Sequence, residues 1–180
     1  TTAVGGFVGF LENKGKTGDL AYVKGQKSLY SGAILVKNST NKVYAGGIAG
    51  IYYGIDNVHT LFMDNVSILG ANSINVSADN AFVGGVIGHA NTVSSLDKIA
   101  VTGNIVVKDV KDSLLAGGLF GYLFSSTMNF NWTNSYYIGD LSLEGSISSK
   151  ATVLAGYLAG SVSMKGNNYA HVIHSCYHGG

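Results

Sequence analysis

The residues with metal-ligand chemistry gather near the C-terminal end of the chain. His171, His174, Cys176 and His178 fall close together there. On a β-strand, alternate side chains share a face, so three of these four would point the same way. Such side chains stand far apart, whereas a structural zinc site takes four close ligands, commonly with a second cysteine pair. We therefore expect an ordinary strand here and no metal site.

Acidic residues are the next candidates for chemistry, and the ten of them are scattered, mostly beside Asn, Lys or Gly. A β-helical enzyme acting on polysaccharide needs two carboxylates at a working distance. Asp97 and Asp140 are the pair most able to meet on adjacent coils, although turn positions are the favoured interpretation of both. No Gly-x-Ser-x-Gly nucleophile elbow occurs. We expect no catalytic residues and keep a β-helical carbohydrate-active enzyme as an alternative.

The charge composition excludes several classes of partner. All eleven basic residues of the 180-residue chain are Lys, and the formal net charge is +1. A near-neutral chain without Arg lacks the usual phosphate-reading side chain, so nucleic-acid binding is not expected. No apolar stretch reaches the length of a membrane span, so we expect no membrane insertion. The single cysteine, Cys176, permits no disulfide within the chain.

A Gly-Gly-x-x-Gly pattern recurs five times, beginning at residues 5, 46, 84, 117 and 156. A nucleotide-binding glycine motif needs a strand, a tight turn and a following helix. Here the glycines lie within short apolar stretches without a helical stripe beside them, so we expect close packing and no cofactor. The last copy has Tyr157 in place of its second glycine. The repeat glycines are Gly5, Gly6, Gly9, Gly46, Gly47, Gly50, Gly84, Gly85, Gly88, Gly117, Gly118, Gly121, Gly156 and Gly160.

The position two residues after the first glycine is large and apolar in every copy. The next position is mixed, since it holds residues as small as Ala49 and as large as Phe120. A position that is large and apolar in every copy indicates an inward face, on which the side chains of successive copies stack. We therefore predict a core ladder formed by Phe7, Ile48, Val86, Leu119 and Leu158.

Alternating apolar residues also fill the segments between these motifs. Ile99, Val101, Ile105 and Val107 alternate with other residues, and the segment 137–143 behaves similarly. This period of two is typical of strands, with Asn- and Gly-rich turns between them. Each repeat therefore contains roughly three short strands. We predict an all-β fold, a parallel β-helix or β-solenoid of about five coils, in one domain spanning residues 1–180. A propeller blade or a meander would leave the apolar columns unaligned.

The five copies resemble GLUG-motif repeats, which occur in large secreted and cell-surface proteins. Ser135–Gly139 and Ser175–Gly179 are similar to the second element of that motif, and 101–105 is similar to its end. The resemblance covers nearly the whole chain. It departs from the family pattern at Tyr157 and in the long intervals between copies. It implies an extracellular or cell-surface location and an adhesin-like role, with no catalytic residues to transfer.

Taken together, these features favour a non-catalytic structural and interaction module, a rigid spacer with a binding surface for protein or glycan. The first copy begins at the very start of the sequence and the last has no closing copy, so we expect a piece of a longer chain. Open strand edges at both ends invite stacking, because they carry unpaired backbone groups. A filament or lattice subunit is therefore a further alternative.

Overall fold

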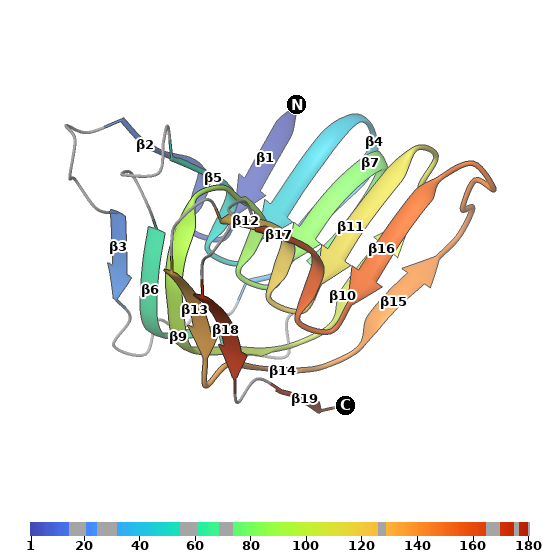
Figure 1. The fold of residues 1–180 in the computed structure, drawn as a ribbon. Helices are drawn as coiled ribbons and strands as arrows, with labels where there is room; N and C mark the ends of the chain where they lie inside the picture. Colours follow the sequence, from blue (N-terminus) through green and yellow to red (C-terminus); the bar gives the residue numbers. More distant parts are fainter. Residues whose placement is uncertain are drawn as a thin grey trace.

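The computed structural model describes residues 1–14, 21–24, 32–54, 61–68, 74–125, 129–164, 170–174 and 177–179. Every regular element within them is a β-strand, and the strands pair in parallel and wind as a β-solenoid (Figure 1). The all-β solenoid expected from the repeats is confirmed. No helix among the described residues has the length and apolar character needed to cross a membrane.

Three parallel sheets form the walls of the solenoid. The first sheet contains β1 (Thr2–Gly5), β4 (Ile34–Gly46), β7 (Ile74–Gly84), β10 (Ile105–Lys108), β11 (Ser113–Gly117), β15 (Leu141–Glu144) and β16 (Thr152–Gly156). The second contains β2 (Val8–Asn13), β5 (Ala49–Gly54), β8 (Ile87–Ala90), β12 (Phe120–Ser125) and β17 (Ala159–Met164). The third contains β3 (Ala21–Lys24), β6 (Leu61–Ile68), β9 (Val93–Thr102), β13 (Asn129–Thr133), β14 (Tyr136–Ile138), β18 (Ala170–His174) and β19 (Tyr177–Gly179).

Each Gly-Gly motif is the bend between a strand of the first sheet and a strand of the second. We call each motif, together with the strands that flank it in the three sheets, a rung. The second sheet has five strands in the order β17-β12-β8-β5-β2, so the five motifs give five rungs. We expected about five coils. The structure forms about three turns, so the number of coils differs slightly from that prediction. The first and last rungs stand at the two ends of this closed part.

Main-chain hydrogen bonds join the five bends in one row. The N–H of Phe7 donates to the carbonyl of Ile48 at 3.3 Å, and Ile48 donates to Val86 at 2.9 Å. Val86 donates to Leu119, and Leu119 to Leu158, both at 2.9 Å. The residues chosen as the core ladder therefore lie over one another in sequence order.

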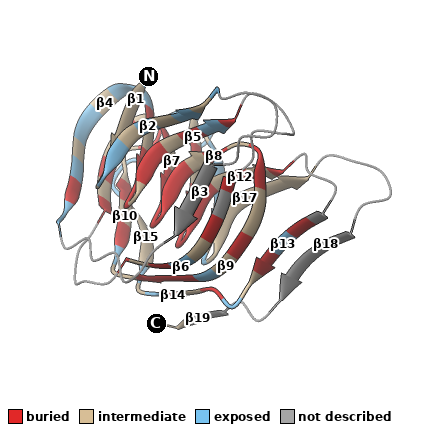
Figure 2. Ribbon diagram, turned by 90° about the vertical axis from the view of Figure 1, so that its left-hand side faces the viewer, coloured by how far each residue is buried: buried red, intermediate tan, exposed pale blue. Residues whose placement is uncertain are grey.

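Burial along this row depends on the position of the rung. Val86 and Leu119 have no exposed surface, and Ile48 and Leu158 are partly buried against the core. Phe7 was expected in the core and is 55% exposed, because the first rung is covered by a neighbouring rung on one side only. Figure 2 shows the same trend, with buried segments on β7 and β12 and exposed ones on β2, which belongs to the first rung.

The second glycine of the motif makes room for a large side chain from the opposite wall. A Cβ on Gly85 would lie 2.7 Å from Cγ1 of Val101, and one on Gly47 would lie 2.9 Å from Cδ1 of Ile68. The same Cβ on Gly118 would overlap the ring of Tyr137. Each of these glycines also faces a backbone carbonyl of the following rung. The chain bends sharply here and the third sheet packs against the bend, so the close approach requires glycine.

Large side chains fill the centre of the closed turns. Phe120 meets Trp132 edge to face, with ring centroids 5.5 Å apart. Trp132, Tyr52 and Tyr137 are almost completely buried. The hydroxyl of Tyr137 donates to the carbonyl of Gly103 at 2.8 Å and lies 3.0 Å from that of Asp140. This core fixes the corners of the solenoid and so positions the polar residues on its outside.

Candidate functional site

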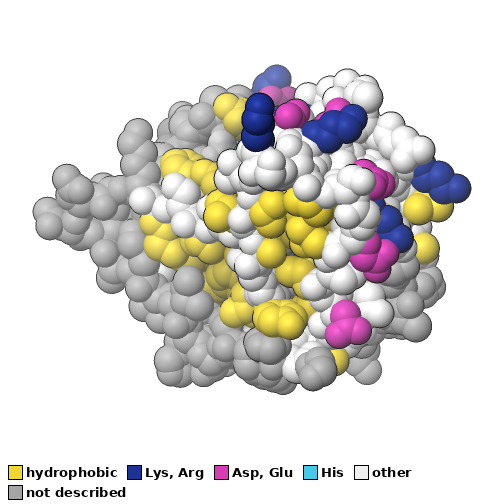
Figure 3. All heavy atoms as spheres, turned by 90° about the vertical axis from the view of Figure 1, so that its right-hand side faces the viewer, with side chains coloured by type: hydrophobic (Ala, Val, Ile, Leu, Met, Phe, Trp, Pro, Cys, Tyr) yellow, Lys and Arg dark blue, Asp and Glu magenta, His cyan; other side chains and the backbone are white. Residues whose placement is uncertain are grey.

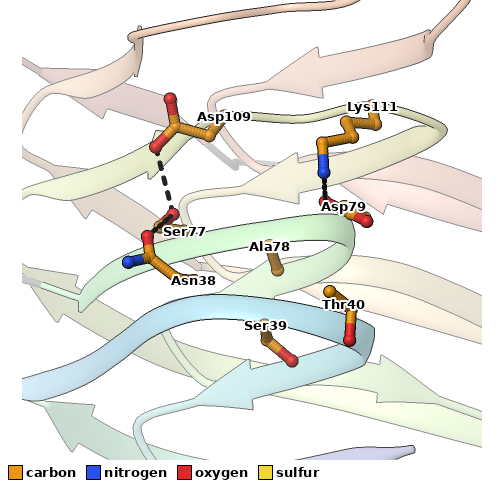
Figure 4. Close-up of a pocket in the computed structure, with 8 residues that line it drawn as sticks. All are labelled: Asn38, Ser39, Thr40, Ser77, Ala78, Asp79, Asp109 and Lys111. Carbon is orange, nitrogen blue, oxygen red and sulfur yellow. Dashed lines mark hydrogen bonds and ion pairs between the residues drawn. The ribbon is translucent and has the colours of Figure 1, made fainter.

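A hollow lined by described residues lies at a corner of the first sheet (Figure 4). It has a volume of about 300 Å³, and a second hollow of about 290 Å³ adjoins it and shares Asn38, Ser77 and Asp109. We call the two together the corner groove. Its lining residues are Leu35, Val36, Lys37, Asn38, Ser39, Thr40, Asn75, Val76, Ser77, Ala78, Asp79, Lys108, Asp109 and Lys111.

Backbone irregularity at this corner creates the groove. The pairing of β4 with β7 shifts register between Val36 and Ser39 and again before Lys42. Asn38 and Asp109 have φ values of 50° and 57°, in the left-handed region that Asn and Asp tolerate better than most residues. The chain therefore bulges on the rungs on either side of Ser77, and the polar side chains of three rungs meet.

Ser77 is the centre of the polar contacts in the groove. Its hydroxyl oxygen lies 3.2 Å from Oδ1 of Asn38 and 3.1 Å from Oδ2 of Asp109, so its single proton can be donated to either one. The other carboxylate oxygen of Asp109 accepts the backbone N–H of Ser146 at 3.1 Å. This backbone hydrogen bond, and then the one from Ser77, lower the pKa of Asp109.

Charged groups flank the same groove. Lys111 pairs with Asp79 at 3.0 Å, and Lys108 pairs with Glu144 at 2.6 Å. The groove thus offers amide, hydroxyl, carboxylate and ammonium groups beside the 61% exposed side chain of Leu35. A carboxylate with a lowered pKa is a weak general base, so Asp109 is badly suited to activate Ser77 as a nucleophile. The chemistry that this set performs well is hydrogen bonding to a polar ligand.

A second polar cluster runs along the third sheet. Asp97 faces Asp64 and Thr133 on the neighbouring rungs, and Lys98 Nζ lies 2.9 Å from Asp97 and 4.0 Å from Asp64. Asp97 also accepts hydrogen bonds from Thr133 at 2.7 Å and from Asn134 at 2.8 Å. The hydrogen bond from Lys98, followed by that from Thr133, lowers the pKa of Asp97 to about 2. Asp97 is therefore an ionised residue that ties the rungs together.

The pairing of Asp97 with Asp140 that we considered from the sequence is wrong. Asp97 lies opposite Thr133, while the backbone N–H of Asp140 bonds to the side chain of Asn104 at 3.0 Å. The two acids stand on different segments of the coil, because the strands turn at Gly103 and Gly139, where φ is 127° and 153°. This corner separates the only acid pair for which the sequence suggested a shared site.

An aromatic cluster spans the bend between the first two sheets, and the sequence analysis did not identify it. His89 lies 4.9 Å from Tyr122, 5.5 Å from Tyr44 and 5.8 Å from Phe82, measured between ring centroids. Burial, and secondarily the positive charge of Lys42, lowers the pKa of His89 to about 4. The rings are tilted against one another by 31° to 73°, so they fill the bend and do not form a flat stacking platform.

The histidine and cysteine cluster lies largely outside the described part of the structure. The backbones of His171 and His174 belong to β18 and that of His178 to β19, but these side chains and Cys176 are not described. The expectation that they bind no metal therefore stays a prediction. In the described portion, no group of three His, Cys, Asp or Glu side chains is placed to hold a metal ion.

Comparisons with protein-family models, with curated proteins and with solved structures find no match for this chain.

Proposed function

We propose that this chain is a non-catalytic structural and interaction module, a rigid spacer that carries a binding surface. The observation that supports this most is the row of hydrogen bonds from bend to bend, which passes through all five rungs. Parallel strands in register place equivalent outward side chains about 4.8 Å apart along the axis. A rod of this kind presents a periodic surface to an extended partner.

The corner groove is the surface that we assign to binding, and an extended polar glycan is the ligand that it fits best. Its amide, hydroxyl, carboxylate and ammonium groups come from successive rungs and can hydrogen-bond several hydroxyl groups in turn. Leu35 and Val36 provide an apolar margin against which a sugar ring can pack. Three lysines line the groove, and three acids offset them, since Asp79 and Asp109 line it and Glu144 pairs with Lys108, so a neutral chain is favoured.

The test is a glycan array, followed by calorimetric titration of any polysaccharide that binds. The variant Ser77→Ala removes the central hydroxyl of the groove and is expected to weaken binding about fivefold, the equivalent of one hydrogen bond. Ser113→Ala is the matched control, since Ser113 also bonds to a neighbouring rung, at 2.8 Å from Asn80, but does not line the groove. Equal effects of the two variants, or a ligand that binds elsewhere, would contradict the assignment of the groove.

The resemblance to GLUG-motif repeats supports an adhesin-like role on the cell surface or outside the cell. The parallel solenoid is compatible with such a setting, since a spacer of this kind holds a binding site away from its anchor. Antibody labelling of intact cells, compared with permeabilised cells, tests the location. Labelling only after permeabilisation would contradict a surface role.

A further inference from the structure

One buried nitrogen of the aromatic cluster has no hydrogen-bond partner. Nδ1 of His89 is closed off from solvent, and no described residue is in position to bond to it. The neighbouring rungs have Ile51 and Tyr122 at this position, so an apolar or aromatic side chain also fits the bend. Buried polar atoms in proteins are hydrogen-bonded with few exceptions, and an exception costs free energy. The unsatisfied imidazole is therefore a feature that packing alone does not explain.

Rings from three strands enclose the imidazole of His89. Tyr44 of β4, Phe82 of β7 and Tyr122 of β12 have ring centroids 4.9 to 5.8 Å from that of His89. The side chain of His89 lies on the outer side of β8, since Ala90 beside it is fully buried. Rotation of this side chain toward solvent therefore breaks no main-chain hydrogen bond between rungs.

The charged group that acts on His89 is the ammonium of Lys42 on β4. Its Nζ lies 5.5 Å from the ring centroid of Phe82, so this ring, which could stabilise a cation, already has one beside it. The titratable groups that face His89 from β4 and β12 are Tyr44 and Tyr122, and phenols are uncharged in acid. The paired position on β5 holds an apolar side chain. A proton on the imidazole would thus add to a local positive charge.

Among the described strands around His89, no carboxylate is placed to offset this charge. Asp79 is the one acid on β4, β5, β7, β8 and β12, and it pairs with Lys111 at the corner groove. Elsewhere on the surface opposite charges lie close together. Figure 3 shows lysine and acidic side chains interspersed along the margin of the face toward β15 and β16. The surroundings of His89 differ from this pattern, because they hold a cation and aromatic rings only.

Protonation of His89 therefore works against the packed arrangement. Both nitrogens of an imidazolium ion carry a proton, so Nδ1 would become a charged donor buried without an acceptor. Burial, and secondarily Lys42, lowers the pKa of His89 from 6.5 to about 4 in the packed position. A ring that reaches solvent regains its ordinary pKa, so acid favours release of the side chain. The open arrangement becomes more favourable by tenfold for each pH unit of this range, or about 300-fold in all.

We propose that the aromatic cluster is a pH-sensitive switch, in which protonated His89 leaves the bend and exposes the rings of Tyr44, Phe82 and Tyr122. The main-chain ladder between rungs stays in place, since the side chain lies outside it. The chain thus presents a larger apolar surface in acid than at neutral pH. None of these residues lines the corner groove, so the switch goes beyond the proposed glycan binding and does not depend on it.

An NMR titration of the whole chain between pH 6.5 and about 4 tests the switch. His89 is expected to titrate below 6.5. The ring signals of Tyr44 and Tyr122 should change with the same midpoint and become accessible to a soluble paramagnetic agent. The indole of Trp132, which is 1% exposed in the core, should not respond. Titration of His89 at its ordinary pKa, unchanged tyrosine signals, or loss of the Trp132 signal at the same midpoint overturns the proposal.

Two variants separate the switch from general effects of acid. His89→Phe keeps a ring in the bend but takes up no proton, so the tyrosine response to acid should disappear. Lys42→Gln removes the nearby charge and should raise the midpoint toward 6.5, whereas Lys150→Gln, at an exposed position outside the cluster, should leave it unchanged. An equal acid response in His89→Phe overturns the proposal, and so does a Lys42→Gln midpoint that stays at the wild-type value. No glycan takes part, so this proposal and the proposed function fail separately.

Discussion

Replacing Gly85 with alanine tests the packing on which the solenoid depends. The added Cβ would lie 2.7 Å from Cγ1 of Val101 and closer still to the carbonyl oxygen of Gly118. Val101 can shift only into a filled core, and the carbonyl belongs to the row of bonds between rungs, accepting the N–H of Gly85 at 3.1 Å. Overpacking a well-filled interior costs about 1–3 kcal/mol, and we expect the upper end here because a backbone atom obstructs the methyl group.

The matched control is Gly179→Ala, because a Cβ there would have its nearest neighbour among the described residues, Cγ1 of Ile138, at an ordinary 3.9 Å. Restricting the unfolded chain makes such a change neutral to slightly stabilising, by up to about 1 kcal/mol. A loss of about 3 kcal/mol lowers the midpoint of thermal unfolding by roughly 6–12 °C in a domain of this size.

Urea unfolding followed by tryptophan fluorescence measures the difference. Trp132 is the only tryptophan and is 1% exposed, so its emission reports loss of the core. A double variant with Val101→Ala should recover part of the loss but not all, since the Gly118 carbonyl remains in place. If Gly85→Ala and Gly179→Ala had the same free energy of unfolding, the close approach of the sheets at the bend would be refuted.

Three further predictions concern buried and ionised groups. The pKa of His89 in the folded chain is about 4, below its ordinary 6.5, so the unfolded chain takes up the proton first and stability falls as pH drops through this window. His89→Gln should remove this pH dependence from the urea midpoints measured between pH 6.5 and about 4. A variant with the same pH dependence as the wild-type chain would contradict the prediction. The pKa of Asp97 is lowered from 3.8 to about 2, so this residue contributes stability that is present above pH 3.8 and is lost as the pH falls through about 2. Asp97→Asn should therefore reduce the pH dependence of stability only in this acidic range. Tyr137→Phe leaves the Gly103 carbonyl without its buried donor and should cost about 1–2 kcal/mol in urea unfolding, whereas the same change at exposed Tyr53 should cost almost nothing.

The glycine repeat made the bends and the row of residues at them predictable from the sequence. Each rung needs glycine where it meets the opposite wall, so the requirement recurs with every coil at Gly47, Gly85 and Gly118. Burial along the row was less predictable, because it depends on neighbours above and below. Phe7 has the same residue character as Leu119 but a neighbouring rung on one side only.

The corner groove could not be read from the sequence, because it depends on local backbone conformation. Asn38 and Asp109 adopt positive φ, yet many other Asn and Asp residues of the chain do not. The Asp64 and Asp97 column depends on the register of β6 against β9, which a one-residue shift would change. The aromatic cluster had a weak signal, since Tyr44 and Phe82 each stand two residues before the first glycine of a motif. The cluster itself could be identified only from the structure, which shows that the first two sheets meet on the outer side of the bend.

Amide hydrogen exchange at Ile48, Val86 and Leu119 tests the stacking of the rungs most directly. Each N–H donates to the next rung at 2.9 Å, in a row that opens only when the rungs separate. The three amides are expected to exchange together, with a free energy of opening close to that of global unfolding. Exchange at the rate of an unstructured peptide at any of these three positions would contradict the winding of this chain as a solenoid.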